Sequence, residues 1–116
     1  MRDSILVDKE LLPYSFDILL GAEWFNLGFK YNENAGVFTV TLSKDEQVIV
    51  YDEPLMYGLP LFNDLYQSGV YPMMTIVPWD ESQQETAVTW DNFGVTVFLT
   101  IEQGDDSDEQ QLYQES

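Results

Sequence analysis

The amino-acid sequence predicts an all-β fold, a single small antiparallel barrel or sandwich of about seven strands with one short helical turn and an acidic C-terminal tail. Apolar and polar residues alternate over several short segments, which is typical of strands. Clusters of Gly, Asn, Asp and Pro separate those segments. No strand–helix–strand rhythm and no internal repeat is visible, which favours a mainly antiparallel arrangement.

The first half of the chain reads as an antiparallel meander. A short leading strand is expected at residues 5–7, and a second strand at 15–20 runs into the tight turn "GA". The third strand, 23–32, alternates strongly, so its side chains should divide between two faces. One face would carry Phe25, Leu27, Phe29 and Tyr31, and the other Trp24, Asn26, Gly28 and Lys30.

Two more strands complete this meander. The turn "NENAG" ends in Gly36, which can adopt the positive φ that hairpin loops use, and a strand at 37–42 follows. The segment "SKDEQ" then turns the chain into a strand at 48–54.

The segment 55–70 interrupts the alternation. It contains Gly58 and Pro60, and its part "LFNDLYQ" is expected to form one or two helical turns with Leu61 and Leu65 on one side.

Two strands are expected in the last part of the chain. Residues 71–80 form the first, and Pro72 and Pro78 indicate an edge strand or positions near strand ends. The polar stretch "ESQQETAVTW" and the turn "DNFG" lead to the last strand at 95–102, in which Val95, Val97, Leu99 and Ile101 alternate with Thr96, Phe98 and Thr100.

Length and charge suggest one domain and a tail. A chain of 116 residues corresponds to one domain, which we place at residues 1–103, and residues 104–116 read as an acidic C-terminal tail. The net charge is −17, and residues 102–116 hold six acidic residues and no basic one. The remainder still carries 15 acidic against 4 basic residues. Such a surface repels nucleic acid phosphates and anionic membranes and suits a basic partner.

The chain contains neither cysteine nor histidine, which removes disulfides, thiolate metal sites and Ser-His-Asp or Cys-His catalysis. The acidic pairs Asp45–Glu46, Asp52–Glu53 and Asp80–Glu81 are interpreted as solvated turn residues rather than catalytic carboxylates. The run "DDSDEQ" lacks the spacing of a calcium loop. We therefore predict no enzyme, no cofactor and no metal.

No targeting or membrane segment is apparent. Asp8, Lys9 and Glu10 interrupt the apolar residues near the N-terminus, and no apolar run reaches membrane-spanning length. We expect a soluble chain made in a cytoplasm.

The expected contact residues are Trp24, Trp79, Trp90, Leu112 and Tyr113. Tryptophan is enriched at protein interfaces, and Leu112 and Tyr113 can anchor an acidic tail on a basic partner. Two other readings stay open. The three tryptophans can form a sugar-stacking platform in a carbohydrate-binding β domain, or the acidic surface can mimic nucleic acid and inhibit a DNA-binding enzyme.

The order of short motifs resembles a family of phage tail proteins, the cyanophage-type baseplate plug domain family. The resemblance spans about residues 12–102. The matching positions are Phe16, Ile18, Leu20 and Gly21, then Phe29, Asn32, Phe38 and Leu42, then Leu55, Gly58 and Leu61, and finally Pro72, Asp91, Gly94 and Leu99. Gly21 directly follows Leu20, and Met73 stands where members commonly have glycine, so the pattern departs at both places.

The resemblance implies a structural protein of a contractile phage tail, without catalytic residues or cofactor. It would lie in the virion, associated with baseplate, hub and tail-tube proteins around the central channel, and a homo-oligomer within the baseplate is possible. It leaves open whether the protein occludes the channel or bridges hub to tube.

Overall fold

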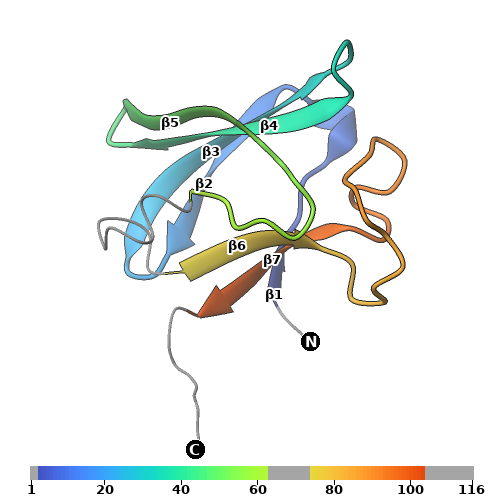
Figure 1. Cartoon of the computed structure of the whole chain (residues 1–116). Helices are drawn as coiled ribbons and strands as arrows, with labels where there is room; N and C mark the ends of the chain where they lie inside the picture. The colour runs from blue at the N-terminus through green and yellow to red at the C-terminus, as the bar shows by residue number, and fades with distance from the viewer. Residues whose placement is uncertain (1–2, 63–73, 104–116) are drawn as a thin grey trace, which may run out of the picture.

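The computed structural model describes residues 3–62 and 74–103, which form seven strands in two antiparallel sheets (Figure 1). One sheet has the order β2-β3-β4-β5 and the other the order β1-β7-β6. The strands are β1 (Asp3–Ile5), β2 (Tyr14–Leu20), β3 (Glu23–Asn32), β4 (Val37–Lys44), β5 (Gln47–Pro54), β6 (Met74–Trp79) and β7 (Phe98–Gln103). The two sheets are not closed into a barrel, so of the two predicted architectures the sandwich is the observed one.

The predicted meander is confirmed for strands β2 to β5, which pair consecutively as antiparallel neighbours. The leading strand differs from the prediction, because it lies at Asp3–Ile5 rather than 5–7 and pairs with β7 of the other sheet. One helical element that the sequence does not predict is present. A 3-10 helix, η1 (Lys9–Leu11), precedes β2, and the Asp8 side chain accepts a hydrogen bond from the Glu10 N–H at its start. Leu65 and most of the expected helical turns lie outside the described residues, as does Pro72.

The last strand begins later than predicted. Residues 95 and 96 belong to a turn in which the Gly94 N–H donates to the Val97 carbonyl at 2.8 Å, and β7 starts only at Phe98. Val95 is therefore 64% exposed instead of sharing the buried face of Val97 and Leu99. The sequence does not reveal this turn, because the alternating valines of "VTVFLTI" are also typical of a strand.

The core lies between the two sheets. Phe25, Leu27 and Phe29 of β3 are buried, as the alternation predicted, and they pack in one cluster with β4, β7 and the segment 55–62. The opposite face of β3 points away from this cluster, because successive strand residues alternate. Pro78 sits one residue before the end of β6, an edge strand, as predicted.

A polar network organises the long connection between β6 and β7. The Asp80 carboxylate, only 2% exposed, accepts four hydrogen bonds, from the Ser82 N–H and hydroxyl and from the Gln84 and Glu85 N–H groups. Glu85 in turn accepts from Asn92 at 3.2 Å and from Thr96 at 3.1 Å. The interpretation of Asp80 as a solvated turn residue is therefore wrong.

The pair Asp52–Glu53 is also structural. β5 bulges opposite Val40 and Leu42, and Asp52 adopts a positive φ of 51° there. Asp52 pairs with Lys30 at 3.0 Å, and Glu53 accepts from the Phe62 N–H at 2.7 Å. Of the three acidic pairs, only Asp45–Glu46 is an exposed turn.

Replacing Glu46 with glycine is expected to stabilise the fold by about 0.5–1 kcal/mol. Asp45 and Glu46 form the two-residue β4–β5 turn with φ values of 52° and 66°, and glutamate is strained in this left-handed region. Urea denaturation would measure the gain. The control is Glu81→Gly, where φ is not positive, and which should lower stability. An equal effect of both glycines would contradict the explanation by strain.

Candidate binding surface

An apolar pair stands on the solvent side of the β2–β3 hairpin. Leu19 and Trp24 are directly opposite each other across the two strands, and they are 48% and 62% exposed. Side chains opposite each other in an antiparallel pair are close enough to form one surface. Trp24 lies on the face of β3 opposite the buried Phe25, Leu27 and Phe29, as the alternation predicts, and β2 adds an aliphatic neighbour to it.

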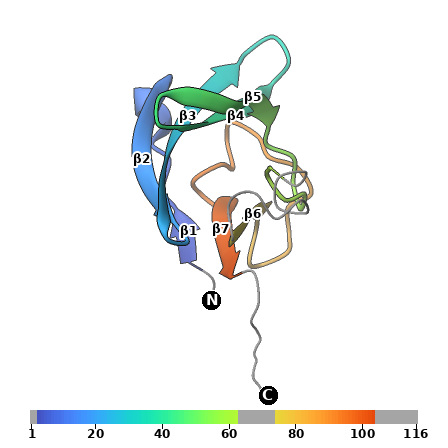
Figure 2. The same cartoon turned by 90° about the vertical axis from the view of Figure 1, so that its left-hand side faces the viewer.

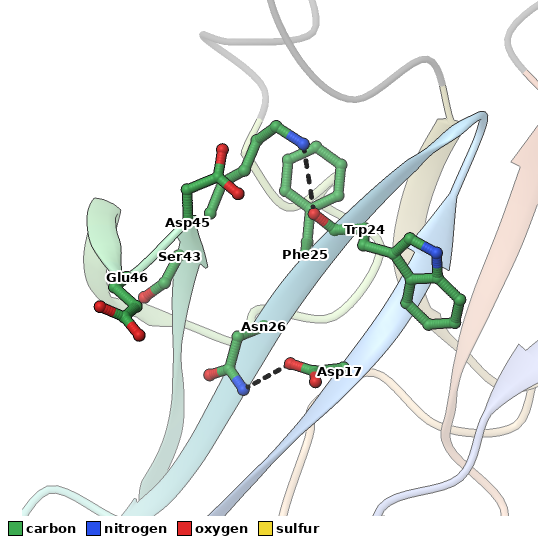
Figure 3. Close-up of a pocket in the computed structure, with 8 residues that line it drawn as sticks. Asp17, Trp24, Phe25, Asn26, Ser43, Asp45 and Glu46 are labelled. Carbon is green, nitrogen blue, oxygen red and sulfur yellow. Dashed lines mark hydrogen bonds between the residues drawn. The ribbon is translucent and has the colours of Figure 1, made fainter.

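A pocket of about 500 Å³ lies next to this pair (Figure 3). The residues that line it include Asp17, Trp24, Asn26 and Ser43 of the sheet and Asp45 and Glu46 of the β4–β5 turn. Asp17 and Asn26 face each other and are joined by a hydrogen bond of 3.2 Å (Figure 3). We call Leu19 together with these six residues the outer patch. It combines one large aromatic side chain with three carboxylates, and Lys44, which also lines the pocket, is paired with Glu23.

Each lysine of the described residues already contacts another group of the protein. Residues 3–62 and 74–103 contain 15 acidic residues and three lysines. Lys9 donates to the Trp90 carbonyl and lies over the Trp90 ring, and Lys30 pairs with Asp52. Lys44 pairs with Glu23 at 3.2 Å. The surface therefore presents acidic groups in excess.

The Asp52 partner also affects the titration of Lys30. The hydrogen bond from Lys30 to the Asp52 carboxylate raises the pKa of the lysine above its ordinary value, and the charge of Asp52 adds to this. The shift reflects the ion pair through which Lys30 contacts Asp52 within the fold.

Trp90 lies apart from the outer patch. Its ring contacts Tyr31 and Phe38, with ring centroids 5.0 and 5.9 Å away, and it is 40% exposed. Tyr31 is near the end of β3, whereas Trp24 is near its start and on the opposite face. Trp90 thus covers an edge of the core, and part of its own ring stays exposed to solvent.

Trp79 belongs to the other sheet. It ends β6, is half-buried and stacks on Tyr57 with centroids 5.3 Å apart. The structure therefore separates the three tryptophans over three places rather than joining them in one platform. Leu112 and Tyr113 lie outside the described residues.

Within 3–62 and 74–103, no group of three or more Asp or Glu side chains is placed to hold a metal ion. In this part of the chain, no helix has the length and apolar character needed to cross a membrane.

Sequence reasoning missed Leu19 and Asp17 as surface residues. The alternation in "SFDILL" places Phe16, Ile18 and Leu20 on one face of the strand and Asp17 and Leu19 on the other. The signal was present, because the "GA" turn pairs Leu19 with Trp24 and Asp17 with Asn26.

Comparison with known proteins gives one match. The sequence model of a protein family described as "Cyanophage baseplate Pam3 plug gp18" matches residues 2–104. No curated protein and no solved structure matches the chain. The match covers nearly all of the chain ahead of the acidic tail, and it agrees with the family indicated by the motif order. The chain therefore belongs to the cyanophage baseplate plug family.

Proposed function

We propose that the protein is a structural component of a phage tail baseplate that binds neighbouring hub and tail-tube proteins around the central channel. In this role it is made in the host cytoplasm and resides in the virion, and it works without catalysis or cofactor. Family membership supports the baseplate role. The outer patch supports the protein contacts.

The observation that carries this proposal is the exposed Leu19–Trp24 pair beside carboxylates. Tryptophan is over-represented among residues that dominate binding energy, because its large rigid side chain loses little conformational freedom on contact. Its 62% exposure leaves a large apolar area in water. A partner that covers Trp24 would gain from this burial, while Asp17, Asp45 and Glu46 would select basic groups around it. The same charge disfavours nucleic acid phosphates.

Capture of baseplate proteins tests the proposal. Tagged protein is purified from infected cells that produce its natural partners, and the bound proteins are identified by mass spectrometry. We expect hub, tail-tube or other baseplate proteins, and about tenfold less of them with Trp24→Ala, because loss of a buried tryptophan contact costs at least about 1.4 kcal/mol of binding.

The matched control is Leu6→Ala, which shortens another exposed apolar side chain, 77% exposed and outside the outer patch. It should leave capture unchanged, and both variants should keep the wild-type melting temperature. Capture of a nuclease or polymerase instead, or of glycan alone, would contradict the assembly role.

A further inference from the structure

The two sheets have four edge strands, and three of them are protected. β1 has only three residues. β5 is bulged at Asp52, and a bulge twists an edge away from additional pairing. The outer side of β6 is covered, since its Ile76 and Pro78 carbonyls accept from the Leu61 and Gly58 N–H groups at 2.8 and 2.9 Å.

β2 is the edge without such protection. It has seven residues, contains neither proline nor lysine, and pairs with β3 in unbroken register. It forms the outermost strand of its sheet (Figure 2). A long regular edge of this kind is a template for one more strand.

The free backbone groups of β2 can be assigned from its hairpin. The pair Leu20–Glu23 flanks a two-residue turn and is hydrogen-bonded, so pairs along the strands alternate from there. The same alternation, followed through β3 to β4, predicts that the Phe38 carbonyl points toward β5. This carbonyl does accept a hydrogen bond on that side, from the Leu55 N–H at 2.9 Å, which supports the assignment. The N–H and C=O groups of Ser15, Asp17 and Leu19 therefore point away from β3.

No described residue occupies these groups. Outside the strand ladders, no backbone hydrogen bond among residues 3–62 and 74–103 involves Ser15, Asp17 or Leu19. On the inner face, Phe16 and Ile18 pack against the core and stay only half-buried. A strand added to β2 would cover these two side chains and lie beside Leu19.

The negative charge on β2 indicates which kind of segment can pair with this strand. Asp17 is the central residue of β2, and its side chain is exposed. Full antiparallel pairing of two copies through β2 would place Asp17 opposite Asp17, and like charges directly opposite each other destabilise a strand pair. The acidic C-terminal tail of the chain has the same sign. A segment with a lysine or arginine opposite Asp17 has the complementary charge.

We propose that β2 binds an extended basic segment of a partner protein by strand addition. Main-chain hydrogen bonds to Ser15, Asp17 and Leu19 supply the affinity, and a basic side chain at Asp17 with an apolar one at Leu19 supplies the selectivity. This inference rests on the proposed assembly role and names the chemistry of the partner.

A defined peptide tests the inference without any baseplate protein. The probe is an extended peptide of about nine residues that alternates lysine with threonine and valine. We expect it to bind and to slow hydrogen exchange at the Ser15, Asp17 and Leu19 amides. The same peptide with N-methyl groups along one edge keeps its charge and loses its donors on that side, so it should bind at least about tenfold more weakly.

Two variants that change the net charge equally distinguish pairing of the peptide with β2 from nonspecific attraction of a basic peptide to an acidic protein. Asp17→Lys should weaken peptide binding about tenfold, whereas Glu81→Lys, in the loop after β6, should change it by less than about twofold. Three results would overturn the inference: no binding at millimolar peptide, equal binding of the N-methylated peptide, or concentration-dependent protection of β2 by a second copy. Peptide binding without capture of baseplate proteins would refute only the assembly role.

Discussion

Replacing Phe38 with alanine is expected to remove about 3–5 kcal/mol of folding free energy. Phe38 is 1% exposed and lies at the centre of an aromatic cluster. Its ring centroid is 4.6 Å from that of Tyr31 and 4.6 Å from that of Phe93. Its ring is also nearly parallel to that of Trp90, at an angle of 6°. The substitution would leave a cavity between β4 and the β6–β7 connection, and the loss is comparable to the whole stability of many small domains.

Urea denaturation followed by circular dichroism would measure this loss, and tryptophan fluorescence would report the release of Trp90 from its aromatic neighbours. Phe38→Leu is the graded control, because it keeps most of the apolar volume and should cost no more than about 1.5 kcal/mol. Tyr51→Ala, at a residue 70% exposed on β5, should stay within about 0.5 kcal/mol. A loss below about 1 kcal/mol for Phe38→Ala would mean that the cluster does not hold the connection to the sheet.

The strands of the meander were predictable because local signals agreed there. In β3, the alternation of Phe25, Leu27 and Phe29 with polar residues coincides with a turn at each end, and the predicted bounds are the observed ones. Burial of one face also fixes register, since a shift by one residue would expose all three side chains. The exposure of Trp24 followed from the same alternation.

The β6–β7 connection was not predictable in the same way. Its shape depends on hydrogen bonds between side chains and backbone, which leave no period in the sequence: the Asp80 carboxylate accepts from the Gln84 N–H, and the Asn92 amide donates to the Ala87 carbonyl. The spacing of Asp80 and Ser82 is compatible with a capped turn, but it is equally common in solvated loops. The burial of Asp80 comes from packing that only the assembled sheets provide.

The candidate surface was predictable in part. Trp24 could be identified because its own strand is strongly amphipathic. Leu19 and the open edge of β2 depend on strand order, which places β2 outermost in its sheet. Strand order is set by long-range pairing rather than by local sequence, so an unprotected edge becomes visible only when all four edges are compared.

Replacing Asp80 with asparagine is expected to lower the melting temperature by roughly 5–10 °C at pH 7. The hydrogen bond from the Ser82 hydroxyl, with those from the Ser82, Gln84 and Glu85 N–H groups, holds the pKa of Asp80 below its ordinary value of 3.8, although burial opposes this. Asparagine can accept through only one of its side-chain atoms, so some of these donors lose their acceptor. The β6–β7 connection would then be the first part of the described fold to loosen.

The pH dependence distinguishes the charge of Asp80 from its shape. Because the folded-state pKa is depressed, the stabilisation is complete above the unfolded value, near 3.8, and is lost as the pH falls through the lower folded value. The difference in melting temperature between wild type and Asp80→Asn should therefore be constant from pH 7 to about pH 5 and shrink below about pH 4. Glu81→Gln, which removes the same charge from an exposed neighbour, should show only a small difference at neutral pH. A gap for Asp80→Asn that is as large at pH 3 as at pH 7 would show that packing, and not the carboxylate charge, holds this loop.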